Sequence, residues 1–228
     1  MFSIPPYCWI VNPARLSRAR LSAHAAIAYR RVCHSRERHI AVAVAAPAAT
    51  LAGSVTKRVN VSSAEAEARG GWSWSPSVSA TGRYVAFTTK ATNLAPGDRD
   101  DRNDVYLRDI RSGTTKWLSY TRSGTSNNGD SRAPSISSSG RFVAFESAAS
   151  TIIGSDTNGL KDIFIHDRYT GKTRLVSKDR FGGLANNGSS DPDISADGRF
   201  AAFRSTASDL ISNDTNNETD VFRRGSFR

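Results

Sequence analysis

The chain has 228 residues, with 31 lysines and arginines against 21 acidic residues, which gives a formal net charge of +10. Residues 1–55 hold seven arginines and a single acid, Glu37, so they carry +6 of this charge and leave +4 for the rest. The rest shows no clustered basic stripe, so a nucleic-acid partner is not expected. Both cysteines, Cys8 and Cys33, lie in residues 1–55. Residues 56–228 therefore contain no disulfide, thiolate metal site or cysteine nucleophile.

Residues 1–55 form a basic leader, and residues 30–52 within it have the layout of a secretory signal peptide. Arg30 to His39 is positively charged, an apolar run of about a dozen residues starts at Ile40, and small residues follow. The run is too short to span a membrane, so no transmembrane segment is expected. The protein is predicted to be periplasmic or extracellular.

The predicted signal begins near Arg30 rather than at Met1, which suggests an alternative start codon, read here as Val32. Residues 1–31 would then lie outside the natural product. N-terminal sequencing of secreted material tests this, and an intact Met1 end would refute it. A disordered basic tail is the alternative.

A 58-residue repeat follows the leader. PSVSATGRYVAFTTKATNL starts at Pro76, PSISSSGRFVAFESAASTI at Pro134 and PDISADGRFAAFRSTASDL at Pro192, and the register holds without a gap. The same shift relates DVYLRD, DIFIHD and DVFRRG, so the copies extend well beyond the first motif.

Each copy is predicted to form short antiparallel strands. PSVS, PSIS and PDIS alternate small and apolar residues, and Thr-Gly, Ser-Gly or Asp-Gly then marks a tight hairpin turn. An aromatic and β-branched strand follows, then the DVYLRD element, then a fourth strand after a glycine turn. Four antiparallel strands per repeat, without helical periodicity, predict an all-β fold of β-propeller blades. The expected elements are a fourth strand over 56–62, blades over 76–120 and 134–178, and a partial blade over 192–228.

The core S-x-[TSD]-G-R-[YF]-x-A-F, followed by D-x-[DN]-x-x-x-D-[VI]-[YF], resembles the WD-like β-propeller repeat of the TolB family. The resemblance covers roughly residues 56–228. It implies a propeller of the bacterial envelope that serves as a protein-binding platform, although propellers also carry enzymes.

About three blades are too few for the usual closed ring. Either the chain is a fragment of a longer propeller, or two chains form a homodimer that completes one ring of about six blades. The third copy loses its pattern at Arg223, which favours truncation or a frameshift. A stable monomer with cooperative melting would contradict the dimeric ring.

His166 is the single histidine of residues 56–228, and it occupies the repeat position of Arg108 and Arg224. We therefore expect a polar surface side chain rather than a member of a catalytic triad. Arg83, Arg141 and Arg199 recur once per copy, and their aliphatic stems are expected to lie across neighbouring blades.

In such a blade, the loop between the second and third strands and the loop between blades open on one face, while the tight turns open on the other. Long loops on a rigid scaffold are where function tends to reside. The tryptophans on this face could equally pack between blades. The candidate ligand-binding residues, suited to protein or glycan contact, are Trp72, Trp74, Asn127, Asn128, Asn186 and Asn187.

Acids and amides at relative positions one, three and seven of each long loop could offer oxygens to calcium. The match to an EF-hand loop is incomplete, since position five is Arg102, Leu160 or Glu218. The alternative is that these residues turn the chain into the third strand. The candidate metal ligands are Asp98, Asp100 and Asp104, then Asp156, Asn158 and Asp162, then Asp214, Asn216 and Asp220.

The favoured function is therefore a non-catalytic propeller module that binds protein or glycan. No cofactor is expected, and calcium is the one candidate ion. One alternative is the propeller part of a larger hydrolase or lyase, and another is a calcium-binding propeller.

Overall fold

The computed structural model describes residues 55–121, 123–154 and 156–227. Residues Lys57–Arg228 form one compact unit. The signal peptide predicted within residues 30–52 lies outside the described residues. Within the described ranges there is no helix that could cross a membrane.

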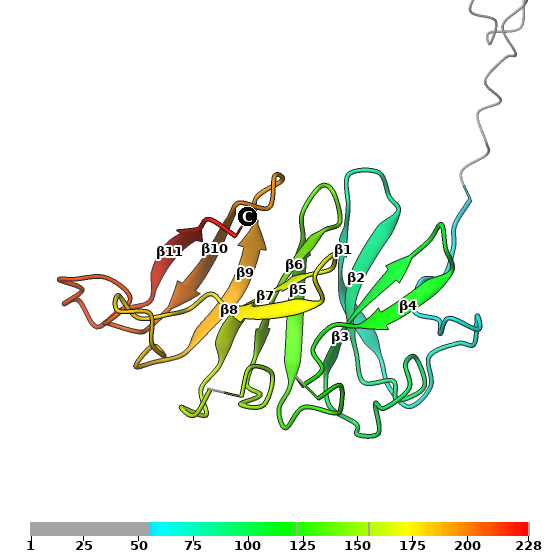
Figure 1. The fold of residues 1–228 in the computed structure, drawn as a ribbon, viewed down its shortest axis with the longest axis horizontal. Coiled ribbons are helices and arrows are strands. Elements are labelled where there is room, and N and C mark those ends of the chain that lie inside the picture. Colours follow the sequence, from blue (N-terminus) through cyan, green and yellow to red (C-terminus); the bar gives the residue numbers. More distant parts are fainter. Residues whose placement is uncertain (1–54, 122, 155, 228) are drawn as a thin grey trace, which may run out of the picture. The chain divides into compact units, whose positions relative to one another are not determined.

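The described residues form three antiparallel sheets, each built from strands that follow one another in the chain (Figure 1). The first two sheets have four strands and the third has three. The structure thus consists of β-propeller blades, as the repeat predicted. Blade 1 comprises β1 (Ser73–Val78), β2 (Tyr84–Thr89), β3 (Asp104–Asp109) and β4 (Thr114–Trp117); blade 2 comprises β5 (Ser131–Ile136), β6 (Phe142–Ser147), β7 (Asp162–Asp167) and β8 (Lys172–Leu175); blade 3 comprises β9 (Ser189–Ile194), β10 (Phe200–Ser205) and β11 (Asp220–Gly225).

The first strand of each blade starts three residues before the Pro-to-Ser motif that predicted it. A β-bulge interrupts its pairing with the second strand in every blade. The residue before the proline has a positive φ each time, at Ser75, Ala133 and Asp191. A proline cannot donate to the sheet, and the bulge accommodates it without ending the strand.

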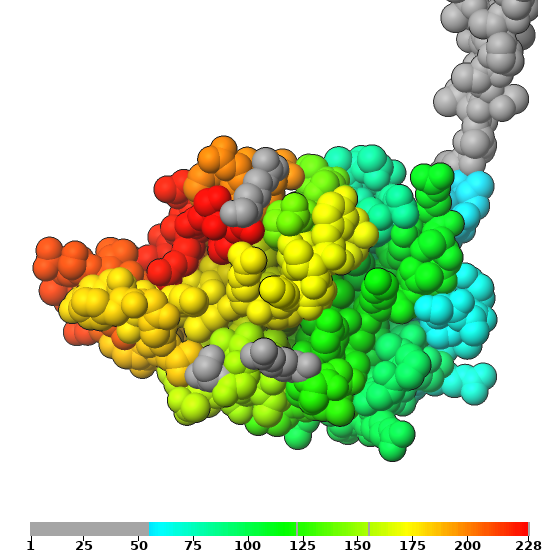
Figure 2. All heavy atoms as spheres, viewed as in Figure 1, coloured from blue at the N-terminus to red at the C-terminus, as the bar shows by residue number. Residues whose placement is uncertain are grey.

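Blade 2 is covered on both faces, which explains its apolar central strands. Val143, Phe145 and Phe164 face blade 1 and pack in one cluster with its Tyr84 and Leu107. Alternate residues of the same strands face the other way, and Phe142, Ile163 and Ile165 pack with Ala201 and Phe203 of blade 3. Figure 2 shows the atoms of successive blades adjoining one another on the face in view. Because β-strand side chains alternate between faces, two covered faces require a nearly continuous apolar strand.

An aromatic-on-glycine contact repeats between blades. Tyr84 of blade 1 lies so close to Gly140 of blade 2 that a Cβ there would be 2.2 Å from the ring. Phe142 lies in the same way against Gly198 of blade 3, at 2.5 Å. The glycine of the predicted hairpin turn therefore has two roles, because it adopts a positive φ and also admits the neighbouring ring.

The prediction of a strand over residues 56–62 is wrong, since Val61 makes only an isolated bridge with Glu67 in the described structure. The segment nevertheless contacts blade 1, because Ser63 Oγ donates to Thr115 O of β4 at 3.3 Å and accepts from Thr115 N at 2.9 Å. A corresponding bridge joins Lys178 and Leu184 after blade 2. Residues 57–68 therefore resemble the connection that follows a blade rather than a blade strand.

The expectation that His166 lies on the surface was also wrong. His166 is buried, and its Nδ1 lies 3.0 Å from Thr173 Oγ1. Arg108 makes the matching contact with Thr115 Oγ1 at 3.1 Å, so this repeat position lies in the interior rather than on the surface.

Two of the recurring arginines, Arg83 and Arg141, form bidentate ion pairs within their own blades. The expectation that the arginine stems lie across neighbouring blades stays a prediction. Arg83 donates from Nε and Nη2 to the two carboxylate oxygens of Asp109 at 2.9 and 2.7 Å. Arg141 pairs with Asp167 in the same bidentate geometry, at 3.0 and 2.8 Å. In blade 3 the aspartate position is Gly225, so Arg199 loses this partner.

Candidate functional site

The blades have two unequal faces (Figure 1). We call the first the long-loop face; its described residues are 90–103, 118–121, 123–130, 148–154, 156–161, 176–188 and 206–219. The opposite turn face is formed by residues 79–83, 110–113, 137–141, 168–171 and 195–199. Because successive strands are antiparallel, their connections alternate between the two faces, and the long connections between the described strands all fall on the same one.

The predicted ligand-binding residues differ in how they lie on the long-loop face. Trp72, just before β1, is 87% exposed, whereas Trp74 within β1 is half-buried. Asn128, Asn186 and Asn187 are exposed. Asn128 Nδ2 donates to Ser150 Oγ at 2.8 Å, and Asn186 Nδ2 donates to Ser208 Oγ at 2.9 Å, so these two asparagines are the structural equivalents.

Asn127 is buried, unlike its neighbour Asn128. Its Nδ2 donates to Asp104 Oδ1 at 3.0 Å and to Ser119 O at 2.6 Å, and its Oδ1 accepts from Gly129 N at 3.1 Å. All of its amide groups are thus used inside the protein, where they hold Asp104.

Phe181 is a surface residue that sequence reasoning did not single out. It lies in the long loop 176–188, is 82% exposed, and has the Arg180 guanidinium 4.7 Å from its ring centroid. Ser123 occupies the same repeat position in the preceding loop. The sequence feature that could have identified Phe181 is a single aromatic residue among the lysine, aspartate, arginine and glycine residues of this loop.

Asp98, Asp100 and Asp104 come together at the base of the first long loop. One carboxylate oxygen from each lies within 4.8 Å of the others. Asp98 and Asp104 are buried, while Asp100 is half-buried. Tyr106 donates its hydroxyl to Asp98 Oδ2 at 2.5 Å, whereas Asp98 Oδ1 is buried and has no partner among the described residues.

Three donors hold one oxygen of Asp104. Its Oδ1 accepts from Ser119 Oγ at 2.6 Å, from Trp117 Nε1 at 2.8 Å and from Asn127 Nδ2 at 3.0 Å. Burial raises the pKa of Asp104 to about 7, and the charges of Asp98 and Asp100 add to this, although the bonds from Ser119 and Trp117 oppose it. The carboxylate is thus held in place while its charge is disfavoured.

The second and third copies differ from the first. In the second, Asp156 and Asp162 are buried, and Asn158 Nδ2 donates to Asp162 Oδ2 at 3.2 Å. Both oxygens of Asp156 are buried without a hydrogen-bond partner among the described residues. In the third copy Asn216 donates to Asp220 at 3.1 Å, but this loop, with Asp214, is largely open to solvent. The three loops match in sequence but not in environment.

The raised pKa of Asp104 leads us to expect that, in the absence of metal ions, the stability of the folded chain changes with pH. With a folded pKa of about 7 against an ordinary value of 3.8, the folded chain keeps this proton between about pH 4 and 7 while the unfolded chain releases it. The contribution of Asp104 to stability therefore falls as pH rises through that window. In urea unfolding with chelator present, we expect the difference in stability between wild type and Asp104→Asn to shift in favour of the variant from pH 4 to pH 7.

That comparison also separates Asp104 from His166, which titrates in an overlapping window. Burial lowers the pKa of His166 to about 4, so its contribution to stability rises between about pH 4 and 6.5. Because His166 is present in both proteins, it cancels in the difference. A difference that does not vary with pH would contradict the assignment.

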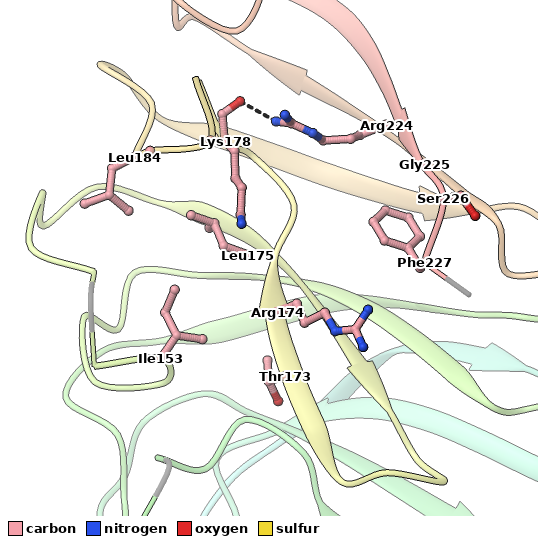
Figure 3. A pocket seen from close by; sticks show the side chains of 12 residues that line it. Ile153, Thr173, Arg174, Leu175, Lys178, Leu184, Arg224, Gly225, Ser226 and Phe227 are labelled. Carbon is pink, nitrogen blue, oxygen red and sulfur yellow. Dashed lines mark hydrogen bonds between the residues drawn. The ribbon is translucent and has the colours of Figure 1, made fainter. Parts of the chain in front are cut away.

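A hollow of about 600 Å³ lies between the outer strand of blade 2 and the end of blade 3 (Figure 3). Leu175 and Leu184 line one side and Phe227 the other. Arg224 donates across it to the main-chain oxygen of Lys178. Arg108 makes the equivalent bond to Ser62 O at 3.1 Å, so this arginine contact belongs to the repeating architecture.

No family model matches the chain, and no curated protein matches its sequence. Similar solved structures include TolB from Acinetobacter baumannii, with 21% identity over 68% of this chain and 30% of that one, and a TM-score of 0.40. The β-propeller domain of the Trilobed protease from Pyrococcus furiosus matches with 13% identity, 69% and 44% coverage, and a TM-score of 0.37. A structure from an analysis of two prolyl endopeptidases matches with 17% identity over 69% of this chain and 21% of that one, and a TM-score of 0.42. The chain therefore spans less than half of each of these proteins.

Proposed function

We propose that this protein is a non-catalytic β-propeller module that binds a protein or glycan partner through its long-loop face. The observation that carries the proposal is the segregation of every long loop between the described strands to one face, with short turns on the other. Long loops held by a rigid scaffold provide an adaptable binding surface.

The exposed groups on this face suit such a partner. Trp72 and Phe181 present large aromatic surfaces to solvent, at 87% and 82% exposure. The amides of Asn128, Asn186 and Asn187 are also exposed. Aromatic side chains supply contact area at low entropic cost, and amides supply hydrogen bonds to peptide or sugar groups.

A non-catalytic role is supported by the position of His166, the one histidine of residues 56–228. The ring is buried in β7, and its bond to Thr173 repeats the bond between Arg108 and Thr115 in blade 1. A residue that alternates with arginine in a repeating interior contact fits a structural role. The resemblance to TolB-like propellers and the signal-like layout of residues 30–52 support a place in the bacterial periplasm or outside the cell.

Site-specific photo-crosslinking tests the binding face. A benzoylphenylalanine at Phe181 preserves an exposed aromatic on the long-loop face, and the same residue at Tyr169 places one on the turn face. Tyr169 is a matched control, being 65% exposed in the 168–171 turn. Irradiation in an envelope extract of the producing cells is expected to give discrete adducts from position 181 and none from position 169.

Adducts from position 169 alone would assign binding to the turn face and contradict the proposal. Adducts from neither position would also count against it, provided that both variants melt at the wild-type temperature.

A further inference from the structure

We propose that the first long loop binds one hard divalent cation, of the calcium class, through the carboxylates of Asp98, Asp100 and Asp104. This inference goes beyond partner binding, and it distinguishes this loop from its two sequence-related copies. It rests on the geometry of the cluster, on an unpaired buried oxygen within it, and on a difference between the copies.

The cluster gathers three acids at short range, with carboxylate oxygens within 4.8 Å of one another. Carboxylates so close repel each other, and the repulsion is strong where water is excluded. The neighbouring arginine does not resolve it, since Arg102 Nε lies 3.9 Å from Asp100 Oδ2 and its side chain is 47% exposed. A cation shared by all three oxygens would remove the repulsion.

The unpaired oxygen belongs to Asp98. This side chain is only 6% exposed, and its Oδ1 has no hydrogen-bond partner among the described residues. Buried polar atoms are nearly always satisfied in native proteins, so an orphaned one calls for a ligand. Asp156 of the second copy shares this feature, so the third carboxylate, Asp100, is what distinguishes the first loop.

Asp104 is prepared to act as a ligand. The bonds from Ser119, Trp117 and Asn127 all reach Oδ1 and fix the orientation of the carboxylate. No hydrogen bond within the described ranges of the chain occupies Oδ2, so this oxygen is available to the cation. Hydrogen bonds of this kind, made to the groups that hold a metal, orient them and raise affinity.

The copies show why the first loop is favoured. Asn158 and Asn216 occupy the position of Asp100 and donate to Asp162 and Asp220 at 3.2 and 3.1 Å. Where those loops use an amide hydrogen bond, the first loop has a third carboxylate instead. With aspartate in place of asparagine, position 100 has no amide donor for Asp104 and carries an additional negative charge. The first loop therefore lacks the internal hydrogen bond of the other copies and offers a third carboxylate to a cation.

The ligand set indicates the class of cation. All three groups are carboxylates, which hard cations prefer as ligands, whereas softer metals prefer imidazole or thiolate. Calcium accepts six to eight oxygens in irregular geometry and suits a loop, whereas magnesium demands a near-ideal octahedron and retains more water. Main-chain oxygens or water would complete the shell.

Calorimetric titration of the chelator-treated full chain with calcium tests the proposal. We expect one equivalent to bind and the melting temperature to rise with calcium and fall again with chelator. Asp100→Asn recreates the residue found in both other copies and should weaken binding about tenfold or more, because it removes a ligand charge. Asp214→Asn, at the half-buried equivalent of Asp98 in the third copy, should leave the affinity unchanged.

Terbium luminescence locates the ion independently of stability. Trp117 donates to Asp104 at 2.8 Å, so terbium bound at this cluster would be sensitised by excitation of that indole. Trp117→Phe should remove most of the sensitised emission while calcium still competes for the site. No heat and no melting shift at millimolar calcium, or an Asp100→Asn affinity equal to wild type, would overturn the proposal. Neither result would bear on the partner-binding face.

Discussion

Replacing Phe164 with alanine is expected to destabilise the folded chain by about 3–5 kcal/mol, the usual cost of removing a buried phenylalanine. Phe164 is fully buried in β7, and its ring stacks on Phe145 with centroids 5.9 Å apart. The cavity would open in the cluster that joins blades 1 and 2, where neighbouring backbone is fixed by sheet pairing and cannot collapse. Guanidinium unfolding monitored by tryptophan fluorescence measures the loss.

Phe222→Ala is the matched control, because Phe222 occupies the same repeat position in blade 3. Phe222 also contacts a phenylalanine, Phe203, at 6.0 Å, but it is only half-buried. Its loss should therefore cost clearly less than that of Phe164. Equal costs for the two variants would mean that blade 2 is not enclosed as described.

Replacing Gly140 with alanine is expected to cost more than replacing Gly82, although the two glycines are repeat equivalents. Both have a left-handed backbone, with φ of 71° and 70°, so alanine costs about 1–2 kcal/mol at either position. At Gly140 the new Cβ would also lie 2.2 Å from the Tyr84 ring. Overpacking of this kind typically adds about 1–3 kcal/mol.

Tyr84 cannot easily move away, because its ring is buried and the Arg168 guanidinium lies 4.2 Å from its centroid. At Gly82 nothing lies within 4 Å of an added Cβ, so only the backbone cost remains. Urea unfolding of both variants measures the difference. Equal destabilisation would contradict the aromatic-on-glycine contact between blades 1 and 2.

The blades could be predicted from the sequence because their strands depend on local, repeated signals. Glycine turns, alternating apolar residues and a constant 58-residue spacing specify the first three strands of a blade in each of three copies. The position of the first strand was less accessible. Its bulge depends on a positive φ at Ser75, Ala133 and Asp191, residues that carry no common side-chain signal.

Burial was the main property that the sequence did not reveal. His166 and Asn127 are polar and suggested surface or ligand-binding roles, yet both are buried and hydrogen-bonded in the interior. Their partners come from other strands and loops, so only the folded arrangement identifies them. Phe181 was missed for the opposite reason, since an apolar residue is normally assigned to the core.

The acidic loops show what position adds to sequence. DRDDRND, DTNGLKD and DTNNETD suggest the same chemistry, and their aspartates recur in register. In the structure the first brings three carboxylates together, the second uses an amide to satisfy Asp162, and the third lies open to solvent. The identity of the residue at position 100 separates the first loop from the other two, and the burial of Asp98 and Asp156 separates the first two loops from the third.

A crystal structure of the full chain grown with calcium tests the central claim most directly, namely that repeated blades place a distinct binding site in the first long loop. It should show the three sheets with β1 to β11 as described, and a calcium peak contacting Asp98, Asp100 and Asp104. The loop around Asp214 should carry no such peak. Ordered loops with these three carboxylates turned apart and no ion between them would contradict the account.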